Sequence, residues 1–216
     1  MGTTVRPSDA VSPDLPPLPR GRARALDRQT NSPLTAAATR YRDPRAHALR
    51  AEYLAAFSGE EVPVPVESIA EDLLGLRIEE RDLGECSGML IPSERLILVN
   101  ASEATNGDVP IRRQRFTIAH ELGHWICHAH AAEEAAPAYC RSRDLSQDAD
   151  RDLEREANVF GAELLMPEAA VRDAWAASRD ATDVADRFEV SALAAQWRLY
   201  TFGLIAEPPA GSRTAN

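Results

Sequence analysis

Two histidines and a glutamate lie close together in the sequence, with the residue types and the spacing for hydrolytic chemistry. They are His120, Glu121 and His124, within the segment RFTIAHELGHWICH at 115–128. On a helix, residues four apart differ by about 40° around the axis, so His120 and His124 can bind one metal ion. Imidazole suits zinc, which lowers the pKa of a bound water to about 7. We expect Glu121, at the edge of the same face, to accept the proton as the water attacks a peptide carbonyl.

The third metal ligand must come from another segment, and the sequence offers two candidates. His130 lies ten residues after His120. This is the spacing of the third histidine in the metzincin pattern, but that pattern turns the chain at a glycine where Cys127 stands here. Glu154 is the better candidate, because it borders the apolar stripe of a predicted helix, where a carboxylate is costly without a compensating positive charge. The stripe consists of Leu153, Ala157, Phe160 and Leu164. Asn158, one turn after Glu154, could hydrogen-bond a ligand histidine.

Several other side chains are candidates for supporting roles. A hydrolase needs a group that stabilises the charge on the attacked carbonyl oxygen, and Tyr139, His128 and Tyr200 are candidates. Tyr139 is preferred because it lies between the two segments that carry the ligands. His128 is otherwise expected to lie behind the metal ligands or at the surface. Glu156, about 200° around the helix from Glu154, is expected to be solvated.

The segments around these residues must form the elements that position them. Apolar periodicity predicts a helix over 44–57, a second helix ending near Gly75, and strands at 77–83, 88–91 and 96–100. The last two strands form a hairpin through the turn at 92–95. Further helices are predicted over 111–128, 150–165, 168–178, 181–188 and 191–200. The predicted fold class is α+β, a small N-terminal sheet or hairpin packed on a mainly helical domain with a helix-turn-helix-like pair near the C-terminus.

The hairpin also offers a place for a substrate. In zinc peptidases, an extended substrate typically pairs with an edge strand beside the metal. Either 88–91 or 96–100 could be that edge. Each could equally be an ordinary strand of the core.

Composition and charge exclude several classes of protein. No stretch approaches the roughly 18 apolar residues that span a membrane, and the N-terminus lacks a secretory apolar segment, so we expect a cytoplasmic protein. The net charge is −10. The first 40 residues hold six Arg and three Asp, which leaves about −13 on the rest of the chain. Such an acidic remainder is a poor match for nucleic acid.

The domain boundaries follow from composition. Residues 1–40 are rich in Pro, Ser, Thr, Ala and Arg and are predicted to be a disordered tail. One catalytic domain is predicted over 41–207, and a flexible tail over 208–216. The three cysteines, Cys86, Cys127 and Cys140, are too few and too irregularly spaced for a disulfide framework and are expected to be thiols. A thiolate of Cys86 reaching the zinc is a minor alternative.

Three blocks of the sequence resemble the ImmA/IrrE family of metallopeptidases, with gluzincin-like zinc ligation. They are RFTIAHELGH at 115–124, EREANVFGAELLMP at 154–167, and ADRFEVS at 185–191 with the Trp-Arg-Leu that starts at Trp197. The resemblance covers roughly 45–206. It implies that His120, His124 and Glu154 bind one zinc ion per chain and that Glu121 is the general base. The family usually has alanine where Gly161 stands.

The resemblance also implies a task, with alternatives. The leading hypothesis is a zinc endopeptidase that cleaves a helix-turn-helix repressor encoded nearby, in a stress-response locus or a mobile element. An alternative is a metal-stabilised antirepressor that sequesters its partner without cleavage. A third hypothesis is DNA binding through the C-terminal helices, but the segment 179–206 holds few arginines and more acids. Mn²⁺ or Fe²⁺ could occupy the same ligands, because ligand type alone does not fix the metal.

Overall fold

The structure is a computed structural model that describes residues 42–58, 62–104, 108–129, 139–140 and 148–209. The side chains at 103, 104, 108–110, 139, 140 and 148–150 lie outside that description, although their backbone is included. The predicted tail at 1–40 lies outside the described residues, as does most of the predicted C-terminal tail.

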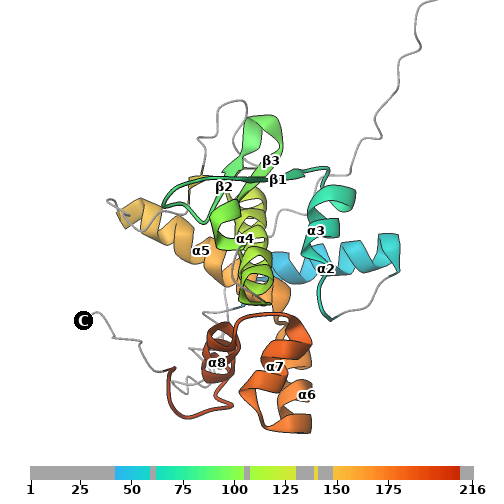
Figure 1. Cartoon of the computed structure of the whole chain (residues 1–216). Helices are drawn as coiled ribbons and strands as arrows, with labels where there is room; N and C mark the ends of the chain where they lie inside the picture. Colours follow the sequence, from blue (N-terminus) through green and yellow to red (C-terminus); the bar gives the residue numbers. More distant parts are fainter. Residues whose placement is uncertain (1–41, 59–61, 105–107, 130–138, 141–147, 210–216) are drawn as a thin grey trace, which may run out of the picture. The chain divides into compact units, whose positions relative to one another are not determined.

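Seven α-helices and four strands make up the described part of the chain (Figure 1). The helices are α2 (Pro44–Phe57), α3 (Val66–Ser68), α4 (Asp108–Cys127), α5 (Asp148–Leu165), α6 (Glu168–Ser178), α7 (Ala181–Phe188) and α8 (Ala192–Thr201). The strands are β1 (Arg77–Arg81), β2 (Gly88–Ile91), β3 (Leu96–Asn100) and β4 (Tyr139–Cys140). Short helical turns add Ile69–Leu73, a π-helical continuation of α3, with Pro92–Glu94 and Ala101–Ala104.

The sheet has the strand order β1-β3-β2-β4. Strands β2 and β3 form the predicted antiparallel hairpin, and β1 runs parallel to β3. The two residues of β4 pair antiparallel with Met89 and Leu90 of β2. Of the two alternatives left open for these strands, an inner position therefore holds for β3, which lies between β1 and β2, and for β2, which lies between β3 and the two-residue β4. The sequence did not reveal β4, since two residues are too short for a periodic signal.

Helix α4, which carries the histidines, packs against both the sheet and α5 (Figure 1). Two glycines bring α4 and α5 close together. A Cβ on Gly123 would lie 2.9 Å from backbone atoms of Ala157, and one on Gly161 would lie 3.2 Å from the backbones of Ala119 and His120. The alanine that the family usually has at 161 would be tight here. This close approach brings the ligand-bearing faces of the two helices together.

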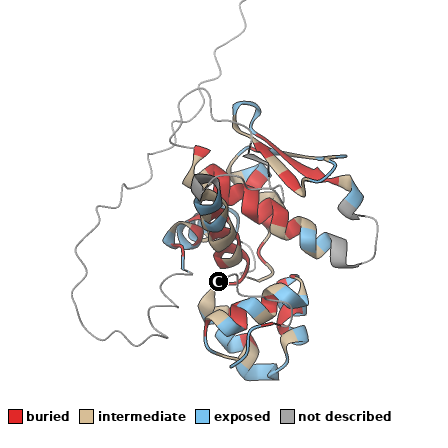
Figure 2. Cartoon of the chain, turned by 90° about the vertical axis from the view of Figure 1, so that its left-hand side faces the viewer, coloured by how far each residue is buried: buried red, intermediate tan, exposed pale blue. Residues whose placement is uncertain are grey.

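The core forms where these elements meet. Buried residues line the facing sides of the helices and the sheet, whereas the outer sides are exposed (Figure 2). Its largest fully buried side chains include Ile69, Leu90, Ile97, Ile118, Leu122, Phe160 and Leu164. At about 25 cal/mol per Å² of apolar surface, such burial is the main source of stability.

Helices α7 and α8 form the predicted helix-turn-helix-like pair, and two arginine contacts join this pair to α4 and α5. Asp180 and Ser191 cap the N-termini of α7 and α8 with their side-chain oxygens. Arg112 of α4 donates to the carbonyl oxygen of Val190, between the two helices (3.2 Å). Arg198 of α8 is buried and pairs with Glu163 of α5. The α+β class predicted from the sequence is confirmed.

Two further predictions can be compared with the described residues. Cys86 is disulfide-bonded and Cys127 is a free cysteine. The expectation that all the cysteines are thiols is therefore wrong for Cys86, because sparse spacing in sequence says nothing about proximity in the fold. Within the described ranges, no helix combines the length and the apolar character needed to cross a membrane.

Candidate metal centre

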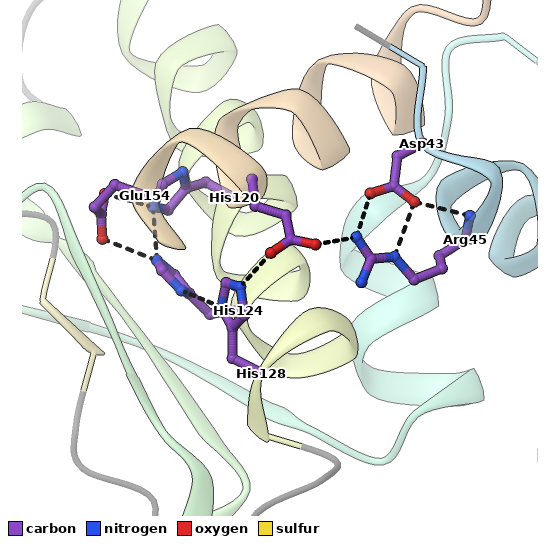
Figure 3. A network of polar contacts seen from close by, with 7 residues as sticks. Asp43, Arg45, His120, His124, His128 and Glu154 are labelled. Carbon is purple, nitrogen blue, oxygen red and sulfur yellow. Dashed lines mark hydrogen bonds and ion pairs between the residues drawn. The ribbon is translucent and has the colours of Figure 1, made fainter. Parts of the chain in front are cut away.

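Three side chains predicted to bind a metal converge between α4 and α5 (Figure 3). The Nε2 atoms of His120 and His124 lie 3.0 Å apart. The two carboxylate oxygens of Glu154 lie 3.0 Å from His124 Nε2 and 3.2 Å from His120 Nε2. The two histidines are fully buried, and the side chain of Glu154 is 12% exposed. One turn of helix separates the histidines, and the glycine contacts bring Glu154 to the same point.

The donor atoms have the chemistry of a cation site. Asn158 Oδ1 lies 3.2 Å from His120 Nδ1, and because a carbonyl oxygen only accepts, this nitrogen carries the hydrogen. His120 Nε2 then presents a lone pair toward His124 and the Glu154 carboxylate. Zinc with ligand bonds of about 2.0–2.2 Å in tetrahedral geometry would place its donors roughly 3.3 Å apart. The observed spacings are close to that value, so the residues present fit a zinc ion.

The charge of Glu154 suits such a site. Burial by itself raises the pKa of Glu154, but the contacts with His120 and His124 outweigh burial and lower the pKa to about 2. The carboxylate is therefore ionised at neutral pH. A carboxylate beside two imidazole nitrogens is a set of donor atoms that suits a divalent cation such as zinc.

Glu121, the predicted general base, is fully buried on α4 and faces the start of β2. A Cβ on Gly88 would lie 3.0 Å from Glu121 Oε1 and 2.3 Å from Thr117 Cγ2. Only glycine at 88 leaves room for these two side chains. Sequence reasoning missed Gly88, and the only signal was a glycine at the first position of a predicted strand.

His128 continues the row of histidines one turn beyond His124. Its Nδ1 lies 3.1 Å from His124 Nδ1, and its Nε2 lies 3.1 Å from a carboxylate oxygen of Glu156. Burial lowers the pKa of His128, although the Glu156 carboxylate opposes this. The expectation that Glu156 is merely solvated is wrong. Although partly exposed, it contacts both His128 and Arg45 of α2.

The remaining sequence candidates have different positions. His130 lies outside the described residues, so the metzincin alternative has no geometry here. The backbone of Tyr139 lies in β4, paired with Leu90, while its side chain is outside the description. Tyr200 lies on α8 with its ring against Trp197. Cys86, being disulfide-bonded, has no thiolate to offer a metal.

A second group of possible ligand atoms is satisfied by a cation of the protein itself. Asp43, Cys127 and Glu156 approach one another closely enough to hold an ion. However, the guanidinium of Arg45 lies 2.7 Å from Asp43 and 2.5 Å from Glu156. Burial also raises the pKa of Cys127 to about 12, so this sulfur keeps its proton. These residues form an ion-pair cluster and are not a second metal site.

Comparison with known sequences covers most of the described chain. The sequence pattern of the IrrE N-terminal-like domain, a peptidase family, matches residues 74–200. The radiation response metalloprotease IrrE of Deinococcus radiodurans is 30% identical over 170 residues. The aligned region is 77% of this chain and 46% of that relative. The chain thus spans about half the length of the curated relative that it matches.

Comparison with solved structures gives a likeness of fold. A transcriptional regulator of Mycobacterium tuberculosis superposes with a TM-score of 0.50 and 14% sequence identity. The match covers 78% of this chain and 52% of that one. At this identity, the likeness concerns the fold alone.

The family match includes the helix that carries His120, Glu121 and His124 and the helix that carries Glu154. It extends over more than half of the chain, and the similarity to IrrE covers three quarters of it. The chain belongs to the family of the IrrE N-terminal-like domain.

Proposed function

We propose that this protein is a zinc-dependent endopeptidase. The observation that carries the proposal is the convergence of His120, His124 and Glu154, whose donor atoms lie 3.0–3.2 Å apart beside the buried carboxylate of Glu121. Membership in a peptidase family and the similarity to a metalloprotease support it. One zinc ion per chain would be held by these three side chains.

Each residue has a role that its position supports. When bound, zinc supplies a Lewis acid that lowers the pKa of water and polarises a carbonyl. Glu121 would take the proton of the attacking water and deliver it to the leaving amine nitrogen. Asn158 orients His120 through its Nδ1 hydrogen. We retain Tyr139 as the group that stabilises the oxyanion, because the pairing of β4 with β2 carries its backbone to the strand that begins beside Glu121.

The substrate class follows from the family and from the charge of the chain. We propose that the substrate is a protein regulator, in particular a helix-turn-helix repressor encoded nearby, and that cleavage takes place in the cytoplasm. The similar protein from Deinococcus radiodurans is a radiation response metalloprotease, which places a related enzyme in a stress response. A net charge of −10 favours a basic protein partner over nucleic acid.

The test separates cleavage from metal binding. Zinc per chain would be measured by elemental analysis in the wild type, His124→Ala, Glu154→Ala and Glu121→Gln, with the exposed Glu52→Gln of α2 as control. We expect about one zinc in the wild type, Glu52→Gln and Glu121→Gln, and little in the two ligand variants. Co-expression with the proposed substrate, a helix-turn-helix repressor encoded nearby, should yield fragments with the wild type and Glu52→Gln, but not with Glu121→Gln.

The same variants address the alternative function. If Glu121→Gln relieves repression in cells as fully as the wild type, the protein acts by sequestering its partner, and the endopeptidase proposal fails. If the wild type holds no zinc when purified without a metal-affinity tag, the basis for metal-dependent cleavage is removed.

A further inference from the structure

A chain of polar contacts extends from His124 to the start of α2 (Figure 3). His124 Nδ1 contacts His128 Nδ1 at 3.1 Å, and His128 Nε2 contacts Glu156 at 3.1 Å. The other oxygen of Glu156 accepts from the Arg45 guanidinium at 2.5 Å. Arg45 also donates to both carboxylate oxygens of Asp43, at 3.0 and 2.7 Å.

The donors and acceptors in this chain can be assigned from its far end. Glu156 is paired with Arg45 and is an acceptor, so the hydrogen of the neutral His128 imidazole lies on Nε2. His128 Nδ1 then carries a lone pair and accepts from the Nδ1–H of His124. His124 Nε2 is consequently left with its lone pair directed at Glu154 and His120.

At the end of this series of contacts, Asp43 and Arg45 hold each other in place. Asp43 is the N-cap of α2, accepting from the backbone N–H of Arg45 at 2.9 Å, and is only 5% exposed. Its carboxylate holds the Arg45 guanidinium, and the two contacts with Asp43 and Glu156 hold the pKa of Arg45 above its usual value despite burial. Arg45 is therefore a permanent cation, and Glu156 has a fixed partner that keeps it an acceptor.

The two ligand histidines are thus oriented by different means. His120 has a single amide partner, Asn158, on the helix that also carries Glu154. His124 depends on His128, which directly follows α4, and on residues of two other helices, Glu156 on α5 and Arg45 on α2. A change in any of the three would alter either the ring angle or the tautomer of His124.

We propose that His128, Glu156 and Arg45 are positioning residues for the metal, which fix the tautomer and the ring orientation of His124 so that Nε2 faces the ion. This inference rests on the proposed metal site. It predicts that the three residues act through zinc affinity, because outer partners of a ligand histidine typically contribute about 10–100-fold to metal affinity.

Zinc affinity would be measured by competition with a chromophoric chelator. We expect His128→Leu to weaken zinc binding by about 10–100-fold and Glu156→Ala by about 10-fold. His128→Asn offers an amide oxygen near the place of Nδ1 and should recover part of the loss. Asp152→Asn is the matched control, because Asp152 lies one turn before Glu156 on α5 and its side chain is 80% exposed. We expect no change in this control.

A second measurement separates positioning from a general loss of structure. Long-range ¹H–¹⁵N spectra of the zinc-loaded protein should show His128 protonated at Nε2 and His124 protonated at Nδ1. Thermal unfolding of the metal-free His128→Asn variant should stay within a few degrees of the metal-free wild type, so that a change in affinity cannot reflect misfolding.

The outcomes distinguish this inference from the function on which it rests. If the wild type binds zinc and both His128→Leu and Glu156→Ala bind it as tightly, the positioning role is wrong while the metal site stands. The same conclusion follows if His128 is protonated at Nδ1. If the wild type binds no zinc at all, the metal site fails and the inference fails with it.

Discussion

Two carboxylates on α5, Glu154 and Glu163, are similarly buried, with side chains 12% and 10% exposed, but they meet different partners. Glu154 faces the Nε2 atoms of two histidines. Glu163 faces the guanidinium of Arg198, which also donates to the carbonyl oxygen of Met166 and lies over the Phe202 ring. Burial raises the pKa of both acids. The histidine contacts outweigh it at Glu154, whereas the Arg198 contact does not outweigh it at Glu163.

The difference shows what a functional carboxylate requires beyond burial. At Glu163 the positive charge is built into the protein, so the pair is complete and holds α8 to α5. At Glu154 the partners are two histidines, whose contacts lower the pKa of the acid, and the proposed zinc ion would supply a fixed positive charge. Burial alone does not distinguish a metal-binding carboxylate from one in a structural ion pair. The groups that surround the carboxylate make this distinction.

The largest effect is expected when the ion pair between Glu163 and Arg198 is broken. Arg198→Met should lower the free energy of unfolding by about 3–5 kcal/mol, because Glu163 is left buried without its cation. The double variant Glu163→Leu/Arg198→Met should recover most of that loss. Urea unfolding at neutral pH measures both. A double variant as unstable as the single one would mean that the pair contributes through packing instead of charge.

Substitution of Glu154 should change the affinity for zinc. Glu154→Gln should weaken zinc binding by more than about 100-fold, since a direct ligand contributes more than an outer partner. Glu163→Gln, on the same helix, should bind zinc as the wild type does. Chelator competition measures the two affinities. Equal losses in the two variants would remove the contrast between a ligand and a structural acid.

Changes at the glycine contacts between α4 and α5 should affect the proposed zinc site at Glu154 more than the Glu163–Arg198 ion pair. Gly123→Ala places a methyl group 2.9 Å from the Ala157 backbone, so it should cost about 1–3 kcal/mol of stability and also weaken zinc binding. Gly161→Ala meets its neighbours at 3.2 Å and should cost less. Unfolding and zinc titration of both variants check this order, and a larger effect at Gly161 would contradict it.

The smallest expected effect is on the pH dependence of the free energy of unfolding below neutral pH. In the metal-free protein, the lowered pKa of Glu154 stabilises the fold above about pH 4.5, and this contribution is lost as the pH falls towards 2. The raised pKa of Glu163 acts in the opposite sense, so its contribution grows as the pH falls from neutral towards about 4.5. Urea unfolding in chelator between pH 2.5 and 7 should show Glu154→Gln flattening the acid loss and Glu163→Gln removing the gain. Parallel slopes in the two variants would contradict the assignment.

Much of the fold could be predicted because its signals are local. The spacing of His120 and His124 and the apolar stripe of α5 are periodic patterns, and the hairpin has a recognisable turn. The link between Arg45 and Glu156 joins residues 111 apart and has no periodic signal. Sequence reasoning placed Glu156 by its angle on the helix alone, which ignores what another helix brings to that side. Gly88 was missed for the same reason, because its importance lies in the side chains that face it.

The N-cap of α2 links the proposed zinc site to the stability of the fold. Asp43 fixes the first turn of α2 and, through Arg45, also holds Glu156. Binding at one end of such a chain and folding at the other are thermodynamically linked, so each stabilises the other by the same free energy. Bound zinc would therefore stabilise the first turn of α2 in addition to its proposed role in catalysis. If the proposed zinc site is right, depletion of zinc should also shorten the lifetime of the folded protein.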